Sequence, residues 1–152
     1  MQRGKPLRSE PDHNSKGTIL VVDDELLIRD LLFDFLSSRG FTVHLAENGR
    51  IALDMIANTN FQVALVDLKM PEMDGIEFTT HLHRMRSEIP VIIMTAYPSM
   101  DSAIESIRNG VFDYIVKPFK IAGLFEVIKS AIREHEMRIK SGYIPHDAAK
   151  GH

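Results

Sequence analysis

The sequence predicts an α/β fold in which a five-stranded, doubly wound parallel sheet carries helices on both faces. Short continuous apolar runs, rich in branched residues, alternate along the chain with stretches whose apolar residues follow the spacing of one helix face. Five strand–helix units of this kind favour a parallel sheet, because right-handed crossovers place the connecting helices on both of its faces. A length of 152 residues suits one compact domain of this type.

The expected strands are the continuous apolar runs, as is typical of strands buried on both faces. They cover residues 18–23 (TILVVD), 41–46, 62–67 (QVALVD), 90–95 (PVIIMT) and 113–116.

The expected helices lie between these strands and after the last one. The first, residues 25–39, has an inward apolar face that ends before Gly40. This face consists of Ile28, Leu31, Leu32, Phe35 and Leu36. Asn48 and Ser99 are the predicted N-caps of the second and fourth helices. The third helix is expected at 75–86 and the fifth at 121–139.

Composition and charge exclude several classes of protein. The formal net charge of −3 gives no basic footprint for nucleic acid or a membrane surface. The absence of cysteine excludes a disulfide framework and thiolate metal sites. No apolar run approaches the roughly 20 residues that span a bilayer, and the N-terminal segment is not a secretory signal. We therefore expect a soluble, cytoplasmic protein.

Two polar ends flank the expected domain. Residues 1–17 and 140–152 hold glycine, proline and polar residues with little to bury, so we expect flexible tails there. The domain itself is expected at residues 18–139.

Polar side chains stand at the ends of four of the expected strands. Asp23 and Asp24 belong to the first strand end, Asp67 to the third, Thr95 to the fourth and Lys117 to the fifth. Doubly wound sheets bind ligands outside the carboxyl ends of their strands. Adjacent carboxylates repel one another there unless a cation neutralises them, and an all-oxygen site suits Mg²⁺.

Each of these residues also has an ordinary explanation when it is taken alone. An acidic pair after a strand is often only a favourable charge at the N-terminus of the next helix. A single threonine or lysine after a strand means even less. The prediction of a functional site therefore rests on the combination of four strand ends, each with its own polar residues.

Four segments, VVDDE, VDLKMPEMDG, MTA and DYIVKPF, occur in this order and resemble the signature segments of response-regulator receiver domains. The resemblance covers about residues 17–138 and implies a flavodoxin-like sheet with strand order 2-1-3-4-5. It implies that Asp67 is the phosphoacceptor of a domain that is not an enzyme in its own right. It also implies that Asp24, Asp67 and the backbone carbonyl of Lys69 ligate Mg²⁺ directly, while Asp23 holds the ion partly through water.

The remaining roles also follow from the resemblance. Thr95, the backbone of Ala96 and Lys117 are expected to bind the phosphoryl oxygens. Thr95 and Tyr114 are the expected switch pair, in which Tyr114 turns inward as Thr95 moves. A cis peptide bond before Pro118 is expected to fix the approach of Lys117.

Two less standard positions are predicted to tune the lifetime of the phosphoryl group. Lys69 lies two residues after Asp67, and Tyr97 lies two residues after Thr95. Side chains at these places can lean over the phosphoryl group and shield it from water.

The expected partners are a histidine kinase or histidine phosphotransfer protein and an unidentified downstream effector. Leu26 and Phe33 fall on the outer side of the first helix, and the hypothesis is that they dock the kinase. The alternative is that they are ordinary exposed apolar residues, which are common. No direct binding of nucleic acid or membrane is expected, and phosphorylation-dependent dimerisation stays open.

Two rival functions share this fold class. A haloacid-dehalogenase-type phosphatase needs a second acid two residues after its nucleophile, where this chain has Lys69. A flavin- or dinucleotide-binding module needs a phosphate loop after the first strand, where the acidic DDE segment would repel phosphate. Three kinds of output are compatible with the sequence. The chain is a stand-alone receiver that signals by protein contact, the receiver of a transcription regulator, or the receiver of a hybrid sensor kinase.

Overall fold

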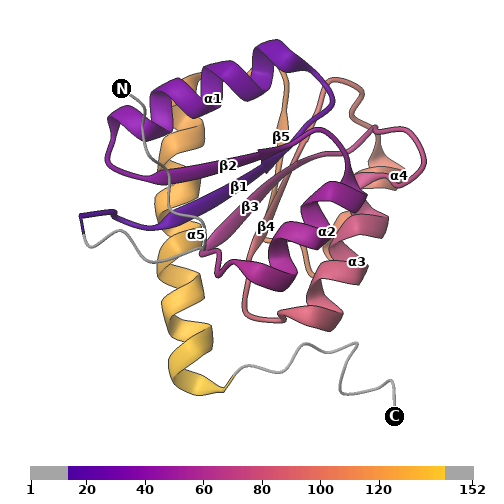
Figure 1. Ribbon diagram of the computed structural model, residues 1–152. Helices are drawn as coiled ribbons and strands as arrows, with labels where there is room; N and C mark the ends of the chain where they lie inside the picture. The colour runs from indigo at the N-terminus through magenta and orange to yellow at the C-terminus, as the bar shows by residue number, and fades with distance from the viewer. Residues whose placement is uncertain (1–13, 143–152) are drawn as a thin grey trace.

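The computed structural model describes residues 14–142 and shows a parallel sheet between two layers of helices (Figure 1). The strands are β1 (Thr18–Val22), β2 (Thr42–Ala46), β3 (Val63–Asp67), β4 (Val91–Thr95) and β5 (Asp113–Val116). They lie in the order β2-β1-β3-β4-β5, and all neighbouring pairs are parallel. The predicted doubly wound fold and strand order are confirmed.

The helices alternate with the strands, and their bounds lie close to the predicted ones. They are α1 (Leu26–Ser38), α2 (Gly49–Asn58), α3 (Gly75–Met85), α4 (Met100–Arg108) and α5 (Ile121–Ser141). The side chains of Asn48 and Ser99 accept hydrogen bonds from the backbone N–H groups of Ile51 and Ser102. Both predicted N-caps are therefore confirmed.

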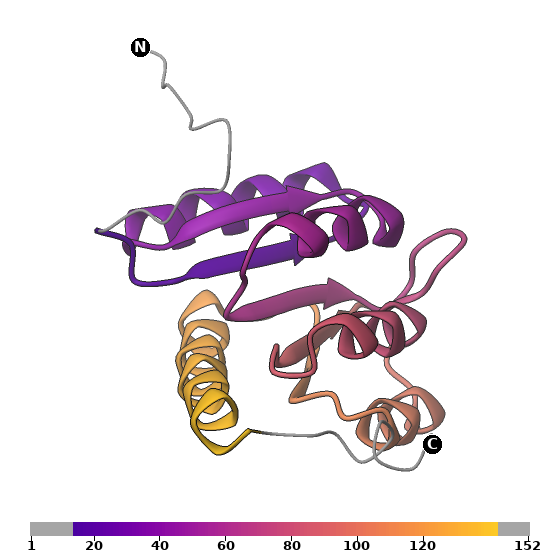
Figure 2. The same cartoon turned by 60° about the horizontal axis from the view of Figure 1, so that its bottom comes forward.

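The sheet is covered on both faces, by α1 and α5 on one side and by α2, α3 and α4 on the other (Figures 1 and 2). The alternation of side chains along β1 separates the two cores. Ile19 and Val21 pack in the cluster beneath α1 and α5, whereas Leu20 and Val22 pack in the cluster with α2 and α3. All four are fully buried, and each such burial stabilises the fold by about 1.5–3 kcal/mol.

The prediction for one core residue of α1, Leu31, is wrong. Leu31 was expected on the inward face, but its side chain is 49% exposed. Leu32 and Leu36 are fully buried and mark the centre of the covered face. At about 100° per residue, Leu31 lies roughly 100° from Leu32, which is beyond the arc that the sheet and α5 cover.

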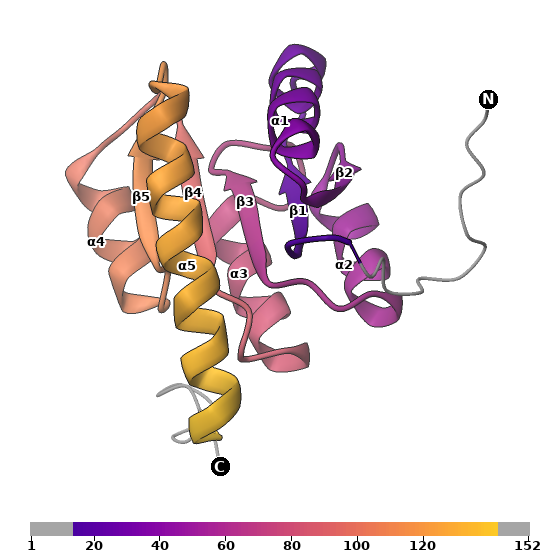
Figure 3. The same ribbon diagram turned by 90° about the vertical axis from the view of Figure 1, so that its left-hand side faces the viewer.

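The two ends of the described chain differ from the predicted domain limits. Within the predicted N-terminal tail, the backbone N–H of Lys16 donates to the carbonyl of Gly40 at 2.9 Å, and Ser15 bonds the Thr42 hydroxyl. At the other end, α5 continues to Ser141, and its last turns extend past the sheet (Figure 3). The rest of the two predicted tails, residues 1–13 and 143–152, lies outside the described residues.

Candidate functional site

The register of the sheet brings the predicted site residues to one edge. Val22 of β1 pairs with Val66 of β3, so the next residues, Asp23 and Asp67, emerge side by side. Farther along the sheet, Thr95 is the last residue of β4 and pairs with Val116 of β5, which Lys117 follows. The strand ends on which the sequence prediction rested therefore meet in space.

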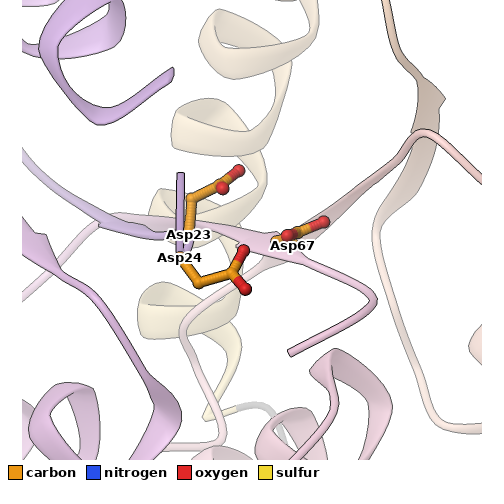
Figure 4. A group of neighbouring side chains, drawn as sticks. All are labelled: Asp23, Asp24 and Asp67. Carbon is orange, nitrogen blue, oxygen red and sulfur yellow. The ribbon is translucent and has the colours of Figure 1, made fainter. Parts of the chain in front are cut away.

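Three carboxylates converge at this edge (Figure 4). One oxygen from each of Asp23, Asp24 and Asp67 lies within 4.8 Å of the others. Asp23 is fully buried and Asp67 is 6% exposed, whereas Asp24 is exposed. The cluster is thus closed on the protein side and open to solvent at Asp24.

Lys117 is the cation that faces this cluster. Its ammonium donates hydrogen bonds to Asp23 Oδ2 at 2.9 Å and to Glu25 Oε1 at 3.1 Å. It also lies 3.5 Å from Asp67 Oδ1. Burial acts to lower the pKa of Lys117, but the hydrogen bond and charge of Asp23 outweigh it and raise that pKa above its usual value. The lysine is therefore held in its charged form.

One buried lysine does not neutralise the acidic cluster. Burial, with the charge of Asp23 added to it, raises the pKa of Asp67 from 3.8 to about 7. Burial also raises the pKa of Asp23, although its bond to Lys117 acts in the opposite direction. A second cation would stabilise the ionised form of these carboxylates. Because all the donor atoms are oxygens, the cluster fits a hard divalent ion.

Two residues that the sequence interpretation did not place in the site fix the position of Asp23. The backbone N–H of Glu25 donates to Asp23 Oδ1 at 2.9 Å, and the guanidinium of Arg29 donates to the Asp23 carbonyl at 2.7 Å. Arg29 lies in the first turns of α1, four residues after Glu25. That spacing places the arginine close to the strand end and could have indicated its role.

The loop between β3 and α3 packs directly against Asp67. Gly75, the first residue of α3, donates its N–H to the carbonyl of Leu68 at 2.8 Å. A Cβ atom added at Gly75 would lie 2.6 Å from the backbone oxygen of Asp67. Only glycine therefore allows this close approach, and the Asp-Gly pair in the loop sequence was the available signal. Lys69, in the same loop, is exposed.

The loop after β4 carries the other predicted phosphoryl-binding groups. Thr95 is fully buried, and its hydroxyl accepts a hydrogen bond from the backbone N–H of Tyr97 at 2.9 Å. The hydroxyl proton of Thr95 is thus available for a second acceptor. Ala96 is exposed, as is Tyr97, at 71%. The peptide bond between Lys117 and Pro118 is cis, as expected.

Tyr114, the predicted switch residue, is partly buried and packs against the cluster on the α2 and α3 side of the sheet. Its hydroxyl lies 2.6 Å from Ser102 Oγ and accepts from the backbone N–H of Ser99 at 3.3 Å. Both serines belong to the start of α4. Ser102 was not predicted, because a serine on an exposed helix carries no signal by itself.

Exposed apolar side chains flank the covered face of α1 on both sides. Leu26 is 59% exposed and Phe33 41%, which agrees with the predicted outer position of both. Leu27 and Leu31 are exposed as well, on the other flank of the helix. The apolar surface of α1 is therefore larger than predicted.

Comparisons with known proteins place this chain in a family. A model of the family described as "Response regulator receiver domain" matches residues 19–129. The chain is 40% identical to the regulatory protein AtoC of Escherichia coli over 120 residues, which are 79% of this chain and 26% of AtoC. It is 36% identical to the transcriptional regulatory protein FixJ of Bradyrhizobium diazoefficiens over 135 residues, 89% of this chain and 66% of FixJ.

Solved structures agree with these sequence matches. A CheY-like receiver domain protein from Methanospirillum hungatei superimposes with a TM-score of 0.78 at 34% identity, covering 82% of this chain and 99% of the other. NtrX from Brucella abortus gives a TM-score of 0.77 at 29% identity, covering 83% of this chain and 29% of NtrX. Among residues 14–142, no helix has the length and apolarity needed to cross a membrane. The chain belongs to the response regulator receiver domain family, the signalling domain of two-component systems.

Proposed function

We propose that this receiver accepts a phosphoryl group on Asp67 from a histidine kinase or histidine phosphotransfer protein. It then changes shape to signal to a downstream partner. The observation that supports this most is the meeting of Asp23, Asp24, Asp67 and Lys117 at one edge of the sheet. The chain spans about a quarter of AtoC and about two thirds of FixJ, so the output of the full signalling protein is part of the proposal.

Asp67 acts as the nucleophile. One of its carboxylate oxygens forms a bond to phosphorus as the bond between phosphorus and the histidine nitrogen breaks. The electron pair of the broken bond stays on the imidazole, which then takes up a proton. A carboxylate needs no general base for this attack, but it must be deprotonated. Because burial raises the pKa of Asp67 to about 7, deprotonation and cation binding favour each other at this site.

The acidic cluster is the proposed site for Mg²⁺. Asp23, Asp24 and Asp67 would hold the ion, with the backbone carbonyl of Lys69 as a further oxygen ligand. The bound ion would supply positive charge next to the phosphoryl oxygens. The bonds from Glu25 and Arg29 keep Asp23 in a fixed place for this role.

Lys117, Thr95 and Ala96 provide the groups that bind the phosphoryl oxygens. Lys117 Nζ is 3.5 Å from Asp67 Oδ1, so it can donate to an oxygen of a group attached there. The Thr95 hydroxyl has its proton free to donate, and the backbone of Ala96 lies next to it on an exposed loop. Charge-assisted hydrogen bonds of this kind contribute about 1.5–3 kcal/mol each.

The switch links this chemistry to α4 and β5. A change of populations from 1:99 to 99:1 needs about 5.5 kcal/mol, which a few bonds to the phosphoryl group supply. Thr95 moves toward the phosphoryl oxygens, and Tyr114 occupies the space behind it. The proposed output surface is formed by residues 99–129. The relatives include the protein named "DNA-binding transcriptional regulator NtrC", so transcriptional control is one output to test.

The test uses a small acyl phosphate as phosphodonor in the presence of Mg²⁺. The wild-type chain should gain the mass of one phosphoryl group, and the Asp67→Asn variant should gain none. The chain should also release no phosphate from small phosphomonoesters, which a dehalogenase-type phosphatase would hydrolyse. Turnover of those esters, or equal labelling of the variant, would contradict the proposal.

A further inference from the structure

The hydroxyl of Tyr114 is anchored to the first turn of α4 rather than left in solvent. It lies 2.6 Å from Ser102 Oγ and accepts from the backbone N–H of Ser99 at 3.3 Å. Its ring packs against the buried cluster that contains Ile93, its partner on β4. The anchor therefore keeps the ring between the sheet and α4.

The two serines form one unit with the helix start. Ser99 Oγ accepts from the backbone N–H of Ser102 at 3.0 Å, which is the N-cap bond of α4. The two side-chain oxygens are also 3.0 Å apart. One turn later, Ser106, which is 1% exposed, donates to the carbonyl of Ser102 at 2.8 Å. Tyr114, Ser102 and Ser99 therefore form one hydrogen-bonded group at the start of α4.

The same helix start is joined to Thr95. The Thr95 hydroxyl accepts from the N–H of Tyr97, and two residues later the chain reaches Ser99. On the neighbouring strand, the N–H of Lys117 donates to the Thr95 carbonyl at 2.8 Å. Thr95, the loop 96–98, the serine pair and Tyr114 are therefore connected by consecutive contacts.

We propose that Ser102 is a positioning residue that holds Tyr114 packed beneath α4, so that the ring and the first turn of α4 move together. This inference rests on the proposed function, in which the packed ring accompanies the phosphorylated form. Ser102 then raises the population of the conformer that accepts the phosphoryl group. No hydrogen bond of Ser102 reaches Asp67 or the acidic cluster, so its effect on phosphorylation passes mainly through Tyr114 and the start of α4.

The experiment is a double-mutant cycle on the rate constant for phosphorylation by a small acyl phosphate with Mg²⁺. Ser102→Ala should slow this reaction by about threefold to fivefold, which corresponds to about 1 kcal/mol or less at 1.4 kcal/mol per tenfold. Ser102→Thr keeps the hydroxyl and should stay within about twofold of the wild type. Ser102→Ala in a Tyr114→Phe background should cause less than about a twofold further loss, because the bond to Tyr114 is already gone and only the bonds between the Ser102 hydroxyl and Ser99 remain to be lost.

Hydrogen exchange supplies a readout that does not depend on phosphorylation. The first-turn amides of α4 should exchange faster in Ser102→Ala than in the wild type, and faster exchange should also appear in Tyr114→Phe. Ser130→Ala is the matched control, since this helical serine on α5 accepts from Arg133 and does not contact Tyr114. It should change neither measurement.

Two results would overturn the role of Ser102. One is wild-type kinetics and wild-type exchange in Ser102→Ala. The other is a loss in the double variant that equals the product of the two single losses, since that would mean the residues act independently. Failure of the proposed function would look different, because the wild-type chain itself would then take no label.

Discussion

Helices α3 and α4 lie next to each other on the same side of the sheet, but they are held in different ways (Figures 1 and 2). Five residues of α3 are buried, among them Ile76, Phe78 and Leu82. In α4 the buried residue is a serine, Ser106, and the apolar residues Met100, Ile104 and Ile107 are exposed.

The two helices are therefore held by different kinds of interaction. α3 is fixed by apolar burial and carries the loop that supports Asp67. α4 is joined to its neighbours by hydrogen bonds, from Tyr114 at its start and from Thr80 of α3 at its end. Such bonds individually contribute less than the burial of a large apolar side chain. A helix attached in this way can shift at lower cost than α3, which fits the proposed output role of α4.

The largest expected effect is on the free energy of unfolding, when one side chain in α3 or in α4 is truncated to alanine. Leu82→Ala removes a fully buried side chain of α3 and should lower the free energy of unfolding by about 2–5 kcal/mol. Ile107→Ala removes a side chain of α4 that is 74% exposed and should change it by less than about 0.5 kcal/mol. Urea unfolding measures both. Equal losses in the two variants would contradict the comparison.

The next effect concerns the pH dependence of stability in the absence of metal. The pKa of Asp67 in the folded chain, about 7, lies above its ordinary value of 3.8. Asp67 binds its proton more tightly in the folded chain than in the unfolded chain, and this stabilises the fold. The stabilisation is fully present below pH 3.8 and is lost as the pH rises through about 7. A pKa shift of this size corresponds to at most about 4 kcal/mol of unfolding free energy. The gain in stability from Asp67→Asn should be smaller, because the variant also loses the attraction between Asp67 and Lys117.

We therefore expect Asp67→Asn to be more stable than the wild type at about pH 8 in a chelator, by roughly 2 kcal/mol, with a smaller difference near pH 5. Denaturant unfolding at the two pH values measures this. Asp101→Asn removes an exposed acid at the start of α4 and is the control for the loss of one negative charge. A stability gain that is the same at both pH values would argue against the buried charge as its cause.

The surface that docks the kinase should differ from the proposed output surface at α4. If α4 reports the signal, the kinase should use a different surface, and α1 offers exposed apolar side chains on the other face of the sheet. Phe33→Ala should slow transfer from a phosphorylated kinase by about tenfold, which is the truncation of one interface residue worth about 1.4 kcal/mol.

Two controls make this result specific. Ile107→Ala on α4 should leave the transfer rate from the kinase unaltered, and Phe33→Ala should react normally with a small acyl phosphate. Normal transfer from the kinase to Phe33→Ala would remove α1 from the docking surface.

The smallest expected effect concerns the lifetime of the phosphoryl group. Lys69 is on the α3 side of the site and Tyr97 on the α4 side, and both side chains are exposed. Replacing both with alanine should increase the dephosphorylation rate by about threefold, because water gains access to the phosphoryl group. A threefold change corresponds to about 0.7 kcal/mol at 1.4 kcal/mol per tenfold. An unchanged rate would mean that neither side chain shields the phosphoryl group.

Sequence patterns predicted the parts of this molecule that depend on periodicity. The strands end where runs of branched residues end, so the pattern alone places Asp23, Asp67 and Thr95 at one sheet edge. The pairing of strands then determines their distances. The raised pKa of Asp67 could not be predicted, because it depends on how completely neighbouring groups exclude water.

The missed features depend on contacts between distant segments. Leu31 has the right spacing for a core residue, but the width of the covered arc depends on how α5 packs. Ser102 and Tyr114 are 12 residues apart, and their bond exists only because β5 lies beside α4. Gly75 looked like an ordinary helix start, although its lack of a side chain lets α3 approach the backbone of Asp67.

The phosphorylated residue can be located after transfer from a phosphohistidine donor. The labelled chain is reduced to trap the acyl phosphate, digested, and sequenced by mass spectrometry. We expect a single modified residue, Asp67, and no transfer to Asp67→Asn. Modification of Asp23 or Asp24 instead, or transfer that persists in the variant, would contradict it.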